Sequence, residues 1–270
     1  MKYFFFDIDG TLKPYGKNIP QSTKNTILKL KESGNRIFLA TGRRKNEIGN
    51  IMDELKIENA VCSGGGTIIL NNRIEYEEFF SKFELKKILI QCKKYNVIMV
   101  SVGDGMCYTS HKGLKTKIYS FLMNIYSKSR YFKVGSVQGN SGNNYTCIKT
   151  LSDEEFLEVK TQKLLFFNCR FIDKIDCLRK YTIYNEKIWK SIEFDFKEKG
   201  IEYIRKKFNV ELKDIVVFGD GRNDISMFKY AENSIAMGNS CLEIKKLASF
   251  VTKSSDENGI EYACKHFGWI

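Results

Sequence analysis

The sequence has few of the residues from which several kinds of site are built. Its 270 residues include two prolines, two histidines and eight cysteines. The small number of prolines argues against long disordered linkers. Because His111 and His266 are the only histidines, a histidine-based triad or a histidine-rich metal site is hard to build. The cysteines are scattered and form no CxxC pair, which argues against a zinc site.

Long apolar runs are also missing. No window of about 18 residues is apolar throughout, so we expect no membrane-spanning helix and no membrane partner. The apolar run at 3–6 is followed at once by acidic residues and by no small-residue cleavage site, so we expect no export signal. Most cysteines lie inside apolar runs, where a free thiol packs as a small hydrophobic group. We therefore expect a reduced, cytoplasmic protein.

The basic residues are unevenly distributed along the chain. The formal net charge is +12, whereas the hydrophobic content of 43% and the charged content of 28% are ordinary for a globular protein. Residues 79–190 contain 20 lysines and arginines against nine aspartates and glutamates, a balance of +11. A segment of this kind attracts anions. Two interpretations stay open, a solvated basic surface and the electrostatic steering of an anionic substrate.

The N-terminal part of the chain alternates between strand-like and helix-like segments. Apolar runs at 3–9, 36–42 and 59–65 have the length of buried strands, and periodic segments at 22–34 and 45–57 predict helices between them. Such alternation is typical of a parallel sheet with helices on both faces. We therefore predict an α/β fold whose core is a doubly wound, Rossmann-like parallel sheet.

The pattern changes in the middle of the chain and then returns. An amphipathic helix is expected at 81–96, strands of a second sheet at 97–102, 145–151 and 163–171, and a glycine- and asparagine-rich loop at 135–145. Further on, the expected helices are 199–210, 223–233 and 241–249, and the expected strands are 214–220 and 234–239. We therefore predict a core of residues 1–78 and 191–270, interrupted by a second α/β domain at 79–190.

Three acidic residues end strands of the predicted core. Asp7 and Asp9 follow the first strand, and Asp220 follows the strand at 214–220. Ligands of open α/β sheets bind beyond the carboxyl ends of the strands, so we expect these carboxylates near one site. Neighbouring buried carboxylates are costly without a cation, and three of them form a hard oxygen site suited to Mg²⁺. Taken by themselves, Asp7 and Asp9 also fit a turn or a helix cap.

Other residues near strand ends suit a phosphoryl oxygen. Thr41 offers a hydroxyl and Gly42 a backbone N–H at a strand-to-helix turn, and Arg43 follows them. Lys199, at the start of the helix that leads to the strand at 214–220, offers a positive charge. Considered singly, Thr41 and Gly42 also fit an ordinary helix cap, and Lys199 also fits a surface lysine.

Together these segments resemble the four motifs of the haloacid dehalogenase (HAD) superfamily and, within it, the Cof-type phosphatases. FFDIDGTL at 5–12 is similar to the first motif and LATGR at 39–43 to the second. Lys199-Gly200 is similar to the third motif. VVFGDGRNDISMF at 216–228, continued by IAMGNS at 235–240, is similar to the long and specific fourth motif.

The resemblance covers the whole predicted core. It places residues 79–190 between the second and third motifs, where this subgroup carries an α/β cap that selects the substrate. The chain departs from the family at Gly64-Gly65-Gly66, where relatives often have Asn-Gly-Ala.

The resemblance implies a Mg²⁺-dependent phosphatase that acts on a small phosphorylated substrate. It makes Asp7 the nucleophile, which becomes an aspartyl-phosphate, and Asp9 the general acid and base. It places Mg²⁺ between the Asp7 side chain, the Asp9 backbone carbonyl and Asp220. The implied phosphate contacts are Thr41, Gly42, Lys199 and Asn223, and the implied supporting residues are Asp224, Gly10, Thr11 and Arg43.

Three other functions fit parts of the pattern. A phosphomutase would pass the phosphoryl group to another hydroxyl, and a regulatory protein would bind a phosphorylated ligand with weak turnover. The intact acid at Asp9 argues against the regulatory protein. The basic segment also permits nucleic-acid binding, but no recognised nucleic-acid motif is present, so we expect no nucleic-acid partner. The leading hypothesis is hydrolysis of sugar phosphates or similar small metabolites.

Overall fold

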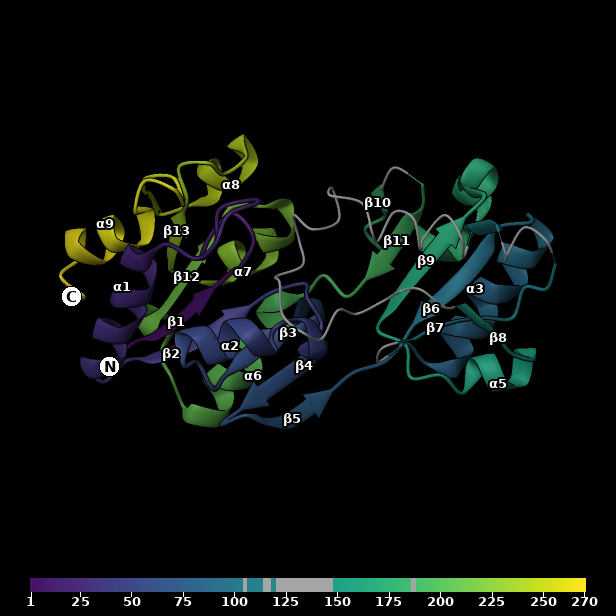
Figure 1. The fold of residues 1–270 in the computed structure, drawn as a ribbon, viewed down its shortest axis with the longest axis horizontal. Coiled ribbons are helices and arrows are strands. Elements are labelled where there is room, and N and C mark those ends of the chain that lie inside the picture. The colour runs from purple at the N-terminus through teal and green to yellow at the C-terminus, as the bar shows by residue number, and fades with distance from the viewer. Residues whose placement is uncertain (104–105, 114–117, 120–147, 186–187) are drawn as a thin grey trace. The chain divides into compact units, whose positions relative to one another are not determined.

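The chain folds into two compact units. The computed structural model describes residues 1–103, 106–113, 118–119, 148–185 and 188–270 (Figure 1). Met1–Glu77 and Asp195–Ile270 make the core unit, and Glu78–Phe194 make the inserted unit. The inserted unit extends past residue 190, where we had predicted its end, because strand β11 (Lys190–Glu193) pairs within its sheet. In the described part of the chain, no helix combines the length and the hydropathy needed to cross a membrane.

The core unit is built on one eight-stranded sheet. Its parallel strands are β1 (Tyr3–Phe6), β2 (Arg36–Ala40), β3 (Ala60–Cys62), β12 (Ile215–Gly219), β13 (Asn233–Ala236) and β14 (Phe250–Val251). Strands β4 (Thr67–Leu70) and β5 (Arg73–Glu77) are antiparallel. The order across the sheet is β14-β13-β12-β1-β2-β3-β4-β5, so the predicted α/β fold with a parallel core is confirmed.

Helices cover both faces of this sheet. They are α1 (Gln21–Glu32), α2 (Gly49–Leu55), α6 (Lys197–Phe208), α7 (Ile225–Tyr230), α8 (Leu242–Leu247) and α9 (Gly259–His266). On one face Phe5 belongs to an apolar cluster that includes Ile201 of α6 and Met227 of α7. On the other face the ring of Phe4 lies 5.1 Å from that of Trp269, which follows α9. Because both faces are covered, all four residues of β1 are apolar and buried.

An antiparallel hairpin extends the sheet where we had predicted no strand. Asn71 and Asn72 join β4 to β5, and their φ angles are 49° and 60°. Two consecutive residues with positive φ form the turn that matches the twist of a hairpin, and asparagine tolerates this conformation. The Asn71-Asn72 pair could therefore have predicted a hairpin turn from the sequence. Because the hairpin is antiparallel, the sheet is mixed at this edge.

The inserted unit has its own six-stranded sheet, formed with β11 by β6 (Ile98–Val102), β7 (Cys107–Thr109), β8 (Ile148–Thr150), β9 (Lys163–Phe167) and β10 (Tyr184–Asn185). The order is β10-β11-β9-β6-β7-β8, and helices α3 (Lys82–Lys94) and α5 (Asp153–Leu157) belong to the same unit. The predicted helix at 81–96 and the strand at 97–102 are confirmed. The strand predicted at 163–171 ends at Phe167, and the loop expected at 135–145 lies outside the described residues.

Candidate active site

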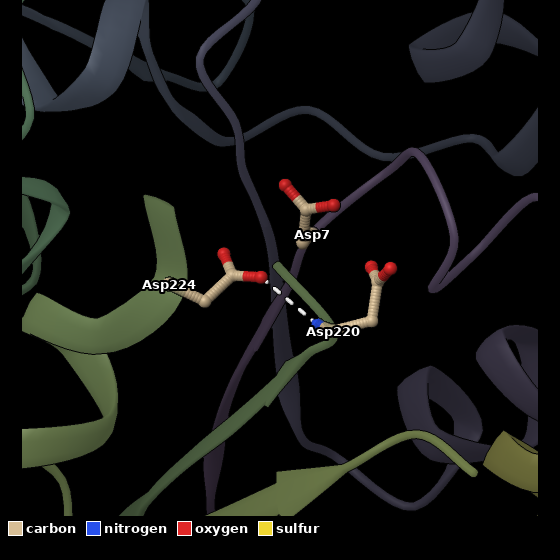
Figure 2. Close-up of side chains that lie close together, drawn as sticks. All are labelled: Asp7, Asp220 and Asp224. Atoms are coloured by element: carbon tan, nitrogen blue, oxygen red, sulfur yellow. Dashed lines mark hydrogen bonds between the residues drawn. The ribbon is translucent and has the colours of Figure 1, made fainter. Parts of the chain in front are cut away.

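The carboxyl ends of two adjacent parallel strands bring three aspartates together. Asp7 follows β1, Asp220 follows the neighbouring β12, and Asp224 ends the short 3₁₀ turn Arg222–Asp224. Carboxylate oxygens of the three residues lie within 4.8 Å of one another, and all three residues are buried (Figure 2). Residues from the two ends of the sequence are thereby placed side by side.

A buried lysine lies among these aspartates, and it is Lys197 rather than the expected Lys199. The Lys197 Nζ atom is 2.7 Å from Asp7 Oδ1 and 2.6 Å from Asp224 Oδ1, and its side chain is 1% exposed. Lys199 is exposed, and its Nζ lies 4.0 Å from the centre of the Phe196 ring. The position beside Asp7 that we had predicted for Lys199 is therefore occupied by Lys197.

Helical spacing explains this correction. Helix α6 begins at Lys197, earlier than the predicted start at 199, and its buried residues are Lys197, Gly200, Ile201 and Ile204. The spacing i, i+3, i+4 and i+7 defines one face of a helix, and Lys199 points away from it. Counting back one turn from Gly200, in place of taking the adjacent residue, identifies Lys197 from the sequence.

The buried charges of this group do not balance. When all three aspartates are ionised, three carboxylates face one ammonium group, which leaves a formal excess of two negative charges. Burial raises the pKa of Asp7 well above its ordinary value; Lys197 opposes this rise and Asp224 adds to it. Burial, followed by the charge of Asp224, raises the pKa of Asp220 to about 6. A divalent cation fits this site, because carboxylate oxygens are hard ligands and the ion's charge equals the excess.

Lys197 itself is held as a cation. Burial opposes its charge, but the carboxylates of Asp224 and Asp7 raise the pKa of Lys197 above its ordinary value. Asp224 is fixed in turn, because its Oδ2 accepts the backbone N–H groups of Asp220 at 2.9 Å and Gly221 at 3.0 Å. Asp224, itself fixed, therefore anchors the lysine together with Asp7.

The loop that follows Asp7 packs directly against Asp220. Gly10 has a φ of +88°, and a Cβ atom there would lie 2.1 Å from Asp220 Oδ2. Both the backbone conformation and the lack of space require glycine at this position. The next residue, Thr11, is fully buried, and its hydroxyl lies 3.0 Å from Asp220 Oδ1, to which it donates. The Asp-Gly-Thr sequence therefore positions a carboxylate from the opposite end of the chain.

Asp9 is paired with Arg43. The Nε and Nη2 atoms of Arg43 donate to the two carboxylate oxygens of Asp9, each at 2.7 Å. The Asp9 side chain is 31% exposed, so solvent reaches it. Arg43 also donates its backbone N–H to the buried hydroxyl of Thr41 at 3.1 Å. The polar residues after β1 and β2 therefore contact each other through Arg43.

Two of the expected residues take no part in these contacts. Gly42 is half-buried at the turn after β2. Asn223 is also half-buried, and its side-chain oxygen lies 2.6 Å from where a Cβ atom of Gly221 would be. Within the residues that the structure describes, no hydrogen bond joins Gly42 or Asn223 to the aspartates. A role for either in phosphate binding stays a prediction.

The fold is that of a known family. A family model described as haloacid dehalogenase-like hydrolase matches residues 4–263. The chain belongs to the haloacid dehalogenase-like hydrolases. Putative phosphatase YkrA of Bacillus subtilis (strain 168) is 29% identical over 282 residues, which cover 100% of this chain and 98% of YkrA.

Two more distant similarities bear on the enzyme class. The 5-amino-6-(5-phospho-D-ribitylamino)uracil phosphatase YitU of B. subtilis is 24% identical over 97% of this chain and 95% of its own. The solved structure of the HAD subclass IIB sugar phosphatase BT4131 superposes with a TM-score of 0.75 at 28% identity, over 100% of both chains. The predicted family and the predicted enzyme class, a HAD-type phosphatase, are confirmed.

Proposed function

We propose that this phosphatase depends on Mg²⁺, that Asp7 is its nucleophile and that its substrates are small phosphorylated metabolites. The observation that carries the proposal is the buried group of Asp7, Asp220, Asp224 and Lys197 at the carboxyl ends of β1 and β12. Three buried carboxylates beside one lysine are costly unless a cation joins them. A carboxylate placed beside a cation suits attack on phosphorus, because the cation reduces repulsion from the phosphate.

Asp7 and Asp220, together with the Asp9 backbone carbonyl, are the groups proposed to hold Mg²⁺. Asp224 is less suited, because Lys197 and two backbone N–H groups already occupy its oxygens. Bound there, Mg²⁺ would supply positive charge that reduces the repulsion between Asp7 and the incoming phosphate. The proposed contacts of the phosphoryl oxygens are Lys197, Thr41, Gly42 and Asn223.

The proposed reaction has two steps. In the first, an Asp7 oxygen bonds to phosphorus while the bond from phosphorus to the leaving oxygen breaks, and Asp9 donates a proton to that oxygen. In the second, Asp9 takes a proton from a water molecule that attacks the same phosphorus, and the bond to Asp7 breaks to release phosphate. Arg43 orients Asp9 through its paired hydrogen bonds, and Lys197 balances charge on the phosphoryl oxygens.

The substrate class is proposed from the relatives and from charge. BT4131 is named a sugar phosphatase, and YitU is named for a small phosphorylated uracil derivative. Residues 79–190, with 20 basic against nine acidic residues, are proposed to act as the cap that selects the metabolite. We also propose a cytoplasmic location, because the seven cysteines that the structure describes are free thiols, the form that reducing compartments maintain.

The test compares the wild type with Asp7→Asn on a panel of phosphorylated metabolites. The wild type with Mg²⁺ is expected to release inorganic phosphate, and Asp7→Asn is expected to lose about 10⁴-fold or more in turnover. Excess chelator is expected to abolish the wild-type activity and added Mg²⁺ to restore it. The control is Asp53→Asn, which makes the same change at an exposed aspartate of α2 in the same unit and is expected to retain activity.

Two results would contradict the proposal. Activity of Asp7→Asn within about tenfold of the wild type would exclude Asp7 as the nucleophile. Formation of a phosphorylated isomer in place of free phosphate would identify a phosphomutase.

A further inference from the structure

Tyr15 contacts the site although it lies outside the four sequence motifs. Its hydroxyl donates to Asp220 Oδ2 at 3.1 Å. The residue as a whole is 61% exposed, whereas Asp220 is 5% exposed. A surface tyrosine therefore directs its one polar side-chain atom onto a buried carboxylate that we propose as a metal ligand.

The local backbone holds Tyr15 in this place. The N–H of Lys17 donates to the carbonyl of Pro14 at 3.1 Å, which closes a four-residue turn with Tyr15 at its second position. Gly16, at the third position, has a φ of +73°, which is the conformation that a type II turn requires there. The side chain of Lys17 lies 3.3 Å from Asp256 and ties the end of the turn to another loop. Tyr15 is therefore presented by a closed turn.

Asp220 accepts hydrogen bonds from three side chains. Thr11 donates to Oδ1 at 3.0 Å, and Tyr15 and Asn239 donate to Oδ2 at 3.1 Å and 3.4 Å. Asn239 donates more closely to the Gly10 carbonyl, at 2.9 Å, so Tyr15 supplies the shorter hydrogen bond to Oδ2. Partners of this kind orient a carboxylate that binds a metal, and losing one typically weakens metal binding.

We propose that Tyr15 is a positioning residue for Mg²⁺ binding, whose hydroxyl holds the Asp220 carboxylate in the orientation that receives the ion. The inference rests on the proposed function, since it takes Asp220 as a metal ligand. Tyr15 acts through Asp220 and not on the phosphoryl group. It therefore sets the concentration of Mg²⁺ that the enzyme needs and leaves the rate at saturating Mg²⁺ unchanged.

The experiment compares Tyr15→Phe with Tyr203→Phe. Each change removes one phenolic hydroxyl from a hydrogen bond to a carboxylate of the core unit, since Tyr203 donates to Glu75 Oε1 at 3.1 Å, outside the site. Chelator-treated full-length proteins are titrated with MgCl₂ alone by isothermal titration calorimetry. Tyr15→Phe is expected to raise the Kd for Mg²⁺ about tenfold. Tyr203→Phe is expected to stay within about twofold of the wild type.

Phosphate release measured against Mg²⁺ concentration gives a second readout. For Tyr15→Phe the half-saturating Mg²⁺ concentration is expected to rise about tenfold, while kcat at saturating Mg²⁺ stays within about twofold of the wild type. The metal-free variants are expected to unfold at the same temperature as the metal-free wild type, which separates positioning from a general loss of stability.

Each contrary result identifies what is wrong. A Tyr15→Phe protein that binds Mg²⁺ as tightly as the wild type, or more tightly, would overturn the role of Tyr15 and leave the proposed function intact. A lower kcat at saturating Mg²⁺ with an unchanged Kd would also overturn it, because Tyr15 would then act on the reaction itself. A wild type that binds no Mg²⁺ would overturn both proposals.

Discussion

Lys197 and Gly200 lie one turn apart on the buried face of α6, and the glycine allows the helix to approach β3 closely. A Cβ atom at Gly200 would lie 2.4 Å from Cγ1 of Val61, the middle residue of β3. The same face of the helix brings Lys197 to within 2.7 Å of Asp7. The helix α6 therefore contacts β3 closely at Gly200 and, one turn earlier, places the buried Lys197 beside Asp7.

Gly200→Ala is expected to displace α6 from β3. The added methyl group meets Val61, and overpacking of this kind costs about 1–3 kcal/mol of unfolding free energy. Turnover is expected to fall further than the stability loss explains, because Lys197 moves with the helix. Urea denaturation and steady-state kinetics measure the two effects.

Two further variants test this explanation. Val61→Ala, added to Gly200→Ala, is expected to restore part of both losses because it removes the nearest clashing atoms. Gly49→Ala, in α2, adds a Cβ atom with nothing within 4 Å and is expected to be tolerated. Wild-type turnover and stability in Gly200→Ala would show that this close contact does not place the lysine.

Lys197→Ala and Lys199→Ala are expected to differ sharply. Removal of Lys197 leaves three buried carboxylates without their cation and removes a charge from the proposed phosphate site. By comparison with the loss of other groups that stabilise transition-state charge, kcat/KM is expected to fall about 10²-fold or more. Lys199→Ala changes an exposed side chain and is expected to stay within about twofold of the wild type. A larger loss of kcat/KM in Lys199→Ala than in Lys197→Ala would show that Lys199 is the phosphate-binding lysine, as we had predicted from Lys199-Gly200.

Glu84 predicts a pH dependence of stability in the inserted unit. Burial alone would raise its pKa, but hydrogen bonds from Lys180, Tyr181 and Ser81 lower the pKa from 4.5 to about 2. Because the folded-state pKa is depressed, the stabilisation is present above the unfolded value of 4.5 and is lost as the pH falls toward about 2.

Glu84→Gln tests this dependence. The Glu84 side chain is 31% exposed, so we expect solvent screening to limit the loss at pH 7 to about 1 kcal/mol. Glutamine at this position can keep the capping box with Ser81, but its amide nitrogen takes the place of Oε1, so the change removes the hydrogen bonds from Lys180 and Tyr181 together with the charge. Urea denaturation followed by circular dichroism measures the free energy of unfolding of both proteins between pH 7 and pH 3. The difference in this free energy between Glu84→Gln and the wild type is expected to shrink as the pH falls. Glu158→Gln, in a pair with Lys82 whose carboxylate is 64% exposed, should show a smaller effect. A pH-independent difference for Glu84→Gln would contradict the electrostatic explanation.

The basic balance of residues 79–190 predicts salt-dependent kinetics if it steers anionic substrates. Lys112, Lys115 and Lys117 are suitable targets, of which the structure describes only Lys112. Changing all three to glutamine is expected to lower kcat/KM for a phosphorylated metabolite and to flatten its dependence on ionic strength, with kcat unchanged. A charge-matched control changes Lys29, Lys56 and Lys229, which are exposed on the core unit. If kcat/KM depends on ionic strength equally in both variants and in the wild type, the basic residues of 79–190 form an ordinary solvated surface and do not steer the substrate.

The family and the order of the core elements were predictable because their signals are local. A parallel strand that is buried on both faces is a continuous apolar run, as in β1 and β12, and the run ends where an acid begins. Asp7 and Asp220 could therefore be assigned to strand ends from the sequence. The hairpin of β4 and β5 was readable too, from its Asn-Asn turn, but we had not predicted it.

The tertiary structure decided which side chains meet. Lys197 contacts Asp7 across 190 residues of sequence, and Tyr15 contacts Asp220 across 205. The structure also accounts for Gly65, which matches the glycine of the relatives' Asn-Gly-Ala, because a Cβ atom there would lie 2.4 Å from the backbone oxygen of Phe196, which precedes Lys197. A local pattern specifies an element and the face that it buries. The partners of that face depend on how closely the elements pack, and each of these elements comes from a distant part of the chain.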